Sequence, residues 1–194
     1  MPIKLSDRFK NTNWQLIIAA PVAAGILHIC ATFAAPYLTG ASAYSRLAPA
    51  LPINKMQVLH PITPGKEPIP FLSPDARYAM CRFDTSQGPV DVKATLPPDA
   101  GWTVTVHSPQ GDNLYAAAST PGRVTPILLV LVPSNDRFLG VTPEALGISR
   151  GTQPPLAVSA TQGIVVVRGP DNGFAYRPRA LAGLKEARCS GRTF

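Results

Sequence analysis

The chain has 194 residues, of which 45% are hydrophobic and 15% charged, and its formal net charge is +7. This length allows one modest folded domain beside a terminal segment. The basic residues are scattered, without a Lys/Arg run or a basic motif interleaved with aromatic residues, which argues against a nucleic-acid-binding protein. A mild positive excess of this kind suits anionic envelope polymers or lipid headgroups.

Residues 14–35 contain no Lys, Arg, Asp or Glu and read WQLIIAAPVAAGILHICATFAA. A helix of this length extends about 33 Å, enough to cross a hydrocarbon core of about 30 Å. We therefore predict a transmembrane helix over residues 14–35. Lys4, Arg8 and Lys10 precede it, and the next basic residue is Arg46. Because positive charge resists translocation, the tail of residues 1–13 should stay in the cytoplasm and the remainder should be exported.

A cleaved signal peptide is the alternative, because the small residues before Ala35 resemble a cleavage site. The apolar run is longer than the 7–15 residues usual for a signal peptide, so an uncleaved anchor is favoured. His28, inside the run, is expected to be a neutral residue that reaches toward the interface; pairing with a partner helix is the functional alternative.

Residues 36–74 are rich in proline and predict a linker. Proline fixes φ and lacks a backbone donor, so the segment should be extended, partly polyproline II, and act as a semi-stiff spacer. Several apolar residues are unusual for a solvated tether, and we expect part of the segment to pack on the domain or on a partner: Leu47, Leu51, Ile53, Met56, Val58 and Leu59.

Residues 75–194 predict an exported β-domain, because apolar residues recur with a period of two between Gly/Pro turns. We expect a hairpin of residues 77–84 and 90–96, strands at 102–107 and 114–118, a central strand at 127–132 buried on both faces, and a last pair at 156–160 and 164–168. Two short helices are expected: the first begins after Thr142, and the second occupies residues 179–188. The predicted fold class is all-β, an antiparallel sandwich or an open barrel, with one N-terminal transmembrane helix and two short helices.

Three cysteines divide between the two parts of the chain. Cys30 lies in the predicted membrane helix, whereas Cys81 and Cys189 lie near the two ends of the exported domain. Oxidising conditions outside the cytoplasm allow a disulfide between Cys81 and Cys189, which would close the domain. Two free, buried thiols are the alternative.

The domain is poor in titratable groups that could cooperate in catalysis. His107 is the sole histidine beyond the linker, and its neighbour Ser108 should point to the opposite face of a strand, so a Ser–His–Asp arrangement with Asp112 is not expected. The sequence has no GxSxG, HExxH or CxxC motif and no phosphate-binding glycine loop. We predict no catalytic residue, no metal site and no cofactor.

Four residues are candidate contacts for a ligand or partner: Trp102, His107, Asp112 and Arg137. Each has a simpler interpretation. Trp102 is expected to pack in the core rather than stack on a sugar, His107 to be an exposed or hydrogen-bonded strand residue, and Arg137 to be a solvated surface charge. The period of two places Trp102 and His107 on opposite faces of their strand.

Two segments carry a resemblance to a known family: RFDTSQGPVDV at residues 82–92 and WTVTVHSPQGDNLY at residues 102–115. Together with VVVRGP at 165–170 and ARC at 187–189, they resemble the bacterial envelope family catalogued as domain of unknown function 1254, in its short membrane-anchored form. The resemblance implies an all-β domain in the bacterial periplasm, held at the inner membrane, with no catalytic residues to transfer. Longer members carry a second domain, which a separate partner could supply.

The sequence therefore favours a non-catalytic, single-pass membrane protein whose periplasmic domain binds another envelope protein or an anionic polymer. One alternative is a small-ligand carrier, in which Ala116, Ala117 and Ala118 leave space for a cavity. The other is an enzyme acting on envelope glycans, which requires Trp102, His107 and Asp112 to converge in one pocket.

Overall fold

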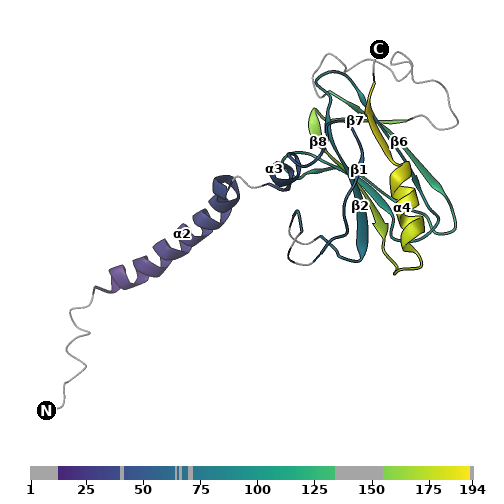
Figure 1. Ribbon diagram of the computed structural model, residues 1–194. Helices are drawn as coiled ribbons and strands as arrows, with labels where there is room; N and C mark the ends of the chain where they lie inside the picture. Colours follow the sequence, from purple (N-terminus) through teal and green to yellow (C-terminus); the bar gives the residue numbers. More distant parts are fainter. Residues whose placement is uncertain are drawn as a thin grey trace. The chain divides into compact units, whose positions relative to one another are not determined.

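The computed structural model describes residues 13–39, 42–63, 65, 67–69, 72–133 and 155–192 (Figure 1). The chain divides into two units, Met1–Ala41 and Ser42–Phe194, which are described separately. Arg137 and the helix predicted after Thr142 lie outside the described residues.

The first unit contains the helix α2 (Trp14–Thr39), which begins where predicted and ends four residues beyond residue 35. Among the described residues it is the one helix long and apolar enough to cross a membrane, over Ile17–Ala35. Within α2, the Thr32 hydroxyl donates a hydrogen bond to the His28 carbonyl oxygen at 2.8 Å. Local pairing of this kind is what an apolar environment requires of a polar side chain.

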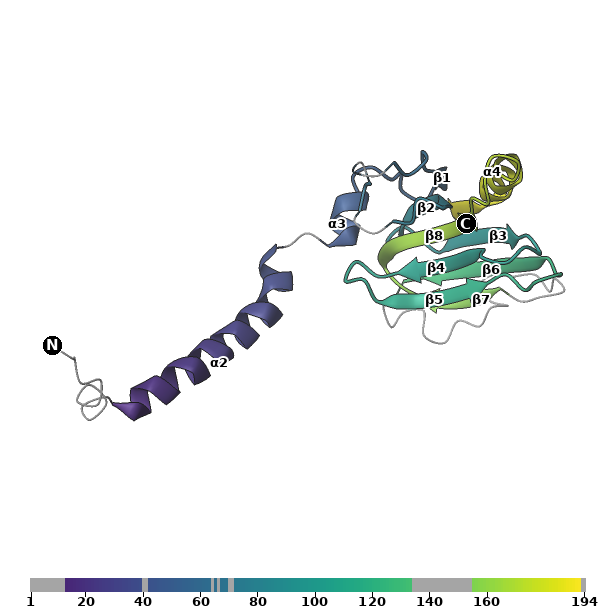
Figure 2. The ribbon, with the colours of Figure 1, turned by 90° about the horizontal axis from the view of Figure 1, so that it is seen from below.

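The second unit is built on two β-sheets, which confirms the all-β prediction and selects the sandwich over the open barrel (Figures 1 and 2). The five-stranded sheet has the order β1 (Gln57–Val58), β2 (Ala76–Asp84), β8 (Gln162–Pro170), β4 (Thr103–His107) and β5 (Asn113–Ala118). The four-stranded sheet has the order β7 (Leu156–Ser159), β6 (Thr125–Val132), β3 (Val90–Leu96) and β9 (Arg188–Gly191).

Two of the predicted strand pairings are wrong. β2 and β3 do not form a hairpin, because β2 pairs with β8 and β3 pairs with β6 and β9 in the opposite sheet. Likewise, β7 pairs in parallel with β6, whereas β8 lies between β2 and β4. A period of two identifies the buried face of a strand but not its neighbour, so consecutive strands can belong to different sheets.

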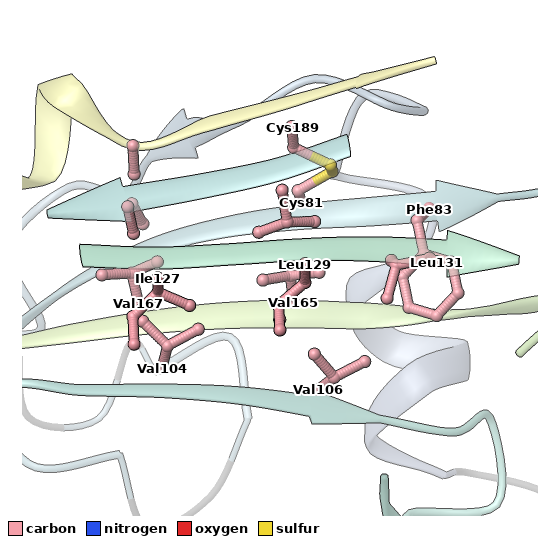
Figure 3. Packing of buried hydrophobic residues seen from close by; sticks show 14 of the residues in the cluster. Cys81, Phe83, Val104, Val106, Ile127, Leu129, Leu131, Val165, Val167 and Cys189 are labelled. Carbon is pink, nitrogen blue, oxygen red and sulfur yellow. A yellow bond between two sulfur atoms is a disulfide. The ribbon is translucent and has the colours of Figure 1, made fainter. Parts of the chain in front are cut away.

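The core lies between the two sheets and consists of the alternate, inward-facing side chains of their strands (Figure 3). Val104, Val165 and Val167 of the five-stranded sheet meet Ile127, Leu129 and Leu131 of β6. β6 is central, as predicted, but only Leu129, Val130 and Leu131 are buried in succession, and Leu128 is 36% exposed.

Helix α4 (Arg177–Glu186) begins two residues before the predicted helix, with Pro178 in its first turn. Proline is favoured there because its missing amide proton has no partner in the first turn of a helix. Ala180 and Leu184 are the buried residues of α4 and join the main core.

The predicted proline-rich spacer is largely part of the domain. We call the described residues between Ser42 and Leu72 the outer layer, because most of its apolar side chains pack on the face of the five-stranded sheet that points away from the main core. Its residues 57–58 form β1 at the edge of that sheet, and Met56 and Val58 pack against the main core. Their short helix α3 (Ala43–Leu47) is capped by the Ser42 hydroxyl, which accepts a hydrogen bond from the Ser45 amide at 3.1 Å. Leu47 and Leu51 pack with the outward-facing Tyr78 and Met80 of β2. This confirms that part of the segment packs on the domain and corrects the expectation of an extended spacer.

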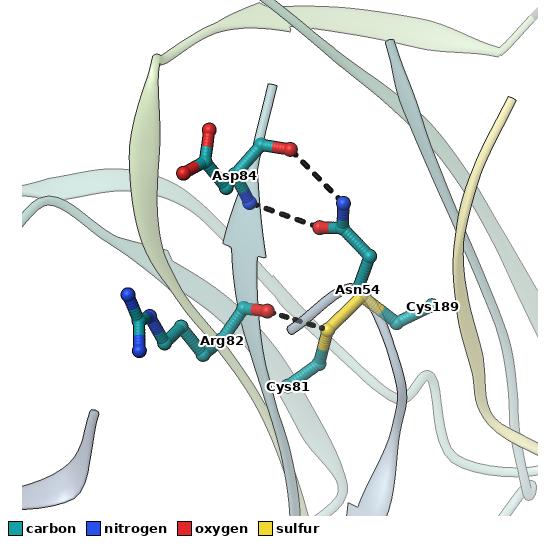
Figure 4. Close-up of a disulfide and its surroundings, with 5 residues drawn as sticks. All are labelled: Asn54, Cys81, Arg82, Asp84 and Cys189. Carbon is teal, nitrogen blue, oxygen red and sulfur yellow. Dashed lines mark hydrogen bonds between the residues drawn. A yellow bond between two sulfur atoms is a disulfide. The ribbon is translucent and has the colours of Figure 1, made fainter. Parts of the chain in front are cut away.

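Asn54 fastens the outer layer to the edge of β2 (Figure 4). Its backbone amide donates to the Arg82 carbonyl at 2.8 Å, and its side-chain amide pairs with both backbone groups of Asp84, at 2.9 and 3.0 Å. The residue adopts a φ of +52°, which asparagine tolerates better than most residues. Asn54 therefore makes hydrogen bonds to the backbone of β2 of the kind that a neighbouring strand would make.

The predicted disulfide is confirmed: Cys81 of β2 is bonded to Cys189 of β9 and so joins the two sheets (Figure 4). Both cysteines are buried in the main core. Cys30 of α2 is free and exposed.

Replacing Cys81 and Cys189 together with alanine should lower the free energy of unfolding by about 2–5 kcal/mol, because the bridge closes a long loop that would otherwise be free in the unfolded chain. Urea unfolding followed by fluorescence measures this difference. Cys30→Ala is the matched control and should change the unfolding free energy by less than about 0.5 kcal/mol. Equal midpoints for the double variant and the control would show that the bridge does not stabilise the domain.

Asn54→Ala should lower the unfolding free energy by about 1–3 kcal/mol, since it removes two side-chain hydrogen bonds and places alanine at positive φ. The exposed neighbour Lys55→Ala serves as control. Limited proteolysis should cut the outer layer of the Asn54 variant faster than that of the control. No difference between the two variants would exclude the role assigned to Asn54.

Candidate functional site

An apolar pocket of about 420 Å³ lies on the outer face of the five-stranded sheet, beneath the outer layer. We call it the outer pocket. Its volume falls within the range of about 300–1,000 Å³ common for ligand sites. It is lined by Ser42, Ala43, Tyr44, Leu47, Ile69, Leu72, Met80, His107, Ser108, Pro109, Gln110, Gly111, Ile164 and Val166.

The floor of the outer pocket exists because β2 and β8 are apolar on both faces. Cys81 and Val165 point into the main core, and their neighbours Met80, Ile164 and Val166 point the other way and line the pocket. The outer layer contributes Leu47 from α3 and covers most of this second apolar face. Met80, Ile164 and Leu47 are buried, so they form the deep part of the pocket.

The polar side of the outer pocket comes from the end of β4 and the turn that follows it. The register of β4 and β5 shifts between Val106 and His107. The Ser108 hydroxyl donates to an Asp112 carboxylate oxygen at 2.9 Å and accepts from the Gln110 and Asp112 amides at 3.2 and 3.1 Å. Gly111 has a φ of +96°, which the tight turn requires. Ser108 thus organises the turn that forms the rim.

The hydrogen bonds of this turn also test the Ser–His–Asp arrangement considered for Ser108, His107 and Asp112. His107 Nε2 lies 3.0 Å from the Thr105 hydroxyl, two residues back on the same face of β4. Ser108 is bonded directly to Asp112, without the imidazole between them. A nucleophile of the serine type needs the imidazole next to the hydroxyl to accept its proton. These hydrogen bonds pair the three residues in a way that does not suit that chemistry.

Trp102 is buried in the main core, where it is 2% exposed. Its ring fits against two glycines: a Cβ on Gly169 of β8 would lie 2.7 Å from the ring and one on Gly183 of α4 would lie 2.9 Å from it. Trp102 is therefore excluded from the candidate contacts, because no ligand at the surface reaches it. It also does not converge with His107, which lines the outer pocket on the opposite face of the sheet.

The outer pocket does not lie beside Ala116, Ala117 and Ala118 of β5, where the small-ligand alternative placed a cavity. Ala116 and Ala118 are exposed, and Ala117 packs against the main core. The sequence pointed to small residues, whereas the pocket arises from large apolar residues that the outer layer only partly covers. Of the three candidate contacts that the structure describes, His107 alone lines the outer pocket. Asp112 lies in the adjoining turn.

Metal chemistry finds no support in the described part of the chain, which contains no group of three or more His, Cys, Asp or Glu side chains able to hold an ion.

A buried ion pair, which sequence reasoning missed, connects β2 to the end of β8. Arg77 Nε lies 2.7 Å from the Asp171 carboxylate, and both side chains are 7% exposed. Arg177 Nε of α4 approaches the same carboxylate oxygen at 3.4 Å. The hydrogen bond from the Arg77 guanidinium holds the pKa of Asp171 below its ordinary value of 3.8, and the charges of both arginines lower it further, against the opposing effect of desolvation. The cluster holds two guanidinium groups and one carboxylate, and it joins β2 and α4 to the residue that follows β8.

No family model and no curated protein matches this chain. Among solved structures, the VPA0106 protein from Vibrio parahaemolyticus covers 77% of this chain with a TM-score of 0.54 and 14% sequence identity. An uncharacterised protein from Burkholderia cenocepacia covers 72% of the chain with a TM-score of 0.40 and 8% identity. The match spans 34% of each solved chain, so this chain corresponds to about a third of their length. The likeness to the Vibrio protein shows a shared fold.

Asp171→Asn should lower the unfolding free energy by about 1–3 kcal/mol at neutral pH, because the buried Arg77 loses its charged acceptor. A lowered pKa in the folded state adds stability above the ordinary pKa of 3.8 and loses it as the pH falls through the folded value. The difference between wild type and variant should therefore shrink below about pH 4.

The measurement is urea unfolding of both proteins at several pH values, with Asp99→Asn, at an exposed turn position, as the matched control. Asp84, whose pKa is also lowered, chiefly by hydrogen bonds from Ser86, contributes equally to all three proteins. A destabilisation that stays constant from neutral pH to pH 3 would rule out an electrostatic role for Asp171.

Proposed function

We propose that the protein is a non-catalytic, single-pass protein of the bacterial inner membrane whose β-domain lies in the periplasm and binds another component of the envelope. The apolar helix α2 supports the anchor, since its span Ile17–Ala35 is long enough for a bilayer and none of it is buried. The disulfide between Cys81 and Cys189 supports an oxidising compartment. The resemblance to the family of domain of unknown function 1254 agrees with this location.

The observation that carries a binding function is the outer pocket. It is preformed and mainly apolar, and among the described residues that line it none is Asp, Glu, Lys or Arg. Sites of this composition hold a ligand by burial and orient it with a few polar groups. His107 hydrogen-bonds to Thr105 along β4, and Ser108 and Asp112 hydrogen-bond to each other within the turn, which favours binding over turnover. The function supported best is therefore carriage or sensing of an apolar ligand.

Binding of another envelope protein is the second candidate. A specific observation favours it: in the Vibrio protein the shared fold is one part of a chain about three times as long. A fold that occurs within a longer chain is suited to contact with a further folded unit. Binding of an anionic polymer has less support, because the outer pocket offers no cation among its described lining residues.

The anchor can be tested with the full chain produced in bacteria. We expect the intact mass in the membrane fraction after an alkaline wash, and digestion of the β-domain by protease added to the outer side of spheroplasts. A double variant, Ile26→Arg with Ile29→Arg, should leave the membrane fraction, because each arginine near a helix centre costs about 3 kcal/mol on insertion.

Ile26→Leu with Ile29→Leu is the matched control and should stay in the membrane. Resistance of the β-domain to limited proteolysis after cell lysis reports that each variant folds. A soluble chain that has lost the residues before Ala35 would contradict the anchor and favour a cleaved signal peptide.

A further inference from the structure

The outer pocket begins close to α2 along the chain. Ser42 and Ala43, which line it, follow Thr39, the last residue of α2, by three and four residues. Three residues span at most about 11 Å when fully extended. The connection along the chain between α2 and the first residues that line the pocket is therefore short. If α2 crosses the bilayer, as the proposed function holds, this short connection joins the β-domain to the membrane.

The lining indicates the shape of the ligand. Its deep and half-buried apolar part is formed by aliphatic side chains: Leu47, Ile69, Leu72, Met80, Ile164 and Val166. Tyr44 and His107 are the rings among the described lining residues. Because these two rings stand beside six aliphatic side chains, the lining offers little aromatic surface for stacking on a sugar or a flat ring system. Aliphatic walls, with a flexible methionine among them, suit a flexible hydrocarbon chain.

The rim indicates the polar part of the ligand. Ser42 and Gln110 are exposed, and Ser108 is half-buried. They are uncharged and carry hydroxyl and amide groups. A buried charge needs a partner, and none of the described lining residues is Asp, Glu, Lys or Arg, so this lining suits a neutral group inside the pocket. Uncharged polar groups at the mouth suit an ester or a hydroxyl at the head of the chain.

We propose that the outer pocket binds the alkyl chain of a lipid, taken from the membrane in which α2 is anchored. The inference rests on the proposed function, because the anchor is what brings the pocket to its ligand. The alkyl chain leaves one apolar environment for another. The Ser42 hydroxyl, as a donor, and the Gln110 side-chain amide are the rim groups that hydrogen-bond the polar end, since the Ser108 hydroxyl is occupied within its own turn.

The test uses the full chain reconstituted in phosphatidylcholine vesicles without detergent, because detergent would compete for the pocket. One arm contains phosphatidylcholine with a photoreactive diazirine in the acyl chain, and the other contains a free fatty alcohol with the same group. After illumination, mass spectrometry locates the labelled residues. We expect label on α2 from both probes, and label on Leu72 and its neighbours in the outer pocket above the level of the remaining β-domain.

Ala43→Trp should close the pocket, since Ala43 is an exposed residue of its lining. Each methylene that the indole displaces weakens binding about fourfold, so displacing two should lower the pocket label by more than about tenfold. Ala118→Trp, at an exposed position of β5, is the matched control and should keep the label. Thermal unfolding of both variants shows that the domain remains folded.

The outcomes separate the two proposals. Label on α2 without label in the pocket from either probe would overturn the lipid site and leave the anchor standing. Absence of label on α2 would overturn the anchor, and pocket label from the fatty alcohol would then still support an alkyl-chain site. Pocket label from phosphatidylcholine identifies membrane lipid as the source, and label from the alcohol alone identifies a free amphiphile. Pocket label that survives Ala43→Trp would contradict the assigned site.

Discussion

The pairing of β2 with β8 is the constraint on which the rest of the domain depends. The two strands are antiparallel and in continuous register, from Ala76 opposite Pro170 to Asp84 opposite Gln162. Both strands carry apolar side chains on both faces, so each face must be covered by another part of the domain. The inner face packs on the second sheet through Cys81, Phe83 and Val165. The outer face, with Tyr78, Met80 and Ile164, is covered by the outer layer. A slip of one residue would exchange the two faces.

This double burial explains where the candidate site lies. The inner face is closed by a complete sheet and a disulfide, and it leaves Trp102 enclosed by the glycines of β8 and α4. The outer face is covered by a proline-rich segment that contains one short helix, α3, and whose two-residue strand β1 lies at the edge of the sheet beside β2. Such a segment cannot form a regular layer, because proline interrupts both helices and central strands. The incomplete cover is what leaves room for the outer pocket.

Much of the fold could be predicted from the sequence. The absence of charge over residues 14–35 predicted the apolar helix, and the period of two located seven strands. The expectation of an oxidising compartment outside the cytoplasm predicted the disulfide. Strand neighbours could not be predicted, since Val90 and Val92 show which side of β3 is buried but carry no mark of pairing with Leu131 and Leu129 rather than with β2. The ion pair of Arg77 and Asp171 joins residues 94 positions apart, which no local pattern reveals.

Four apolar residues in the sequence indicate that the outer face of β2 is covered. Tyr78 and Met80 are apolar residues on the face of β2 that the hairpin interpretation assigned to solvent, and Leu47 and Leu51 are apolar residues in a supposed spacer. Each set lacked a partner in the sequence analysis, and the structure pairs them with one another. The pocket itself could not be foreseen, because its lining comes from α3, β2, β4 and β8 together. Cys81, Cys189 and Trp102, which the sequence analysis singled out, lie in the main core on the inner face of the sheet.

Amide hydrogen exchange of the outer layer tests this account most directly. The Asn54 and Leu59 amides donate to the Arg82 and Tyr78 carbonyls of β2, each at 2.8 Å. If the outer layer is part of the domain, these two amides should exchange slowly, with protection that is lost together with that of β2. Exchange at the rate of an unstructured chain, while β2 stays protected, would show that residues 42–72 are a free spacer and that the outer pocket does not persist in solution.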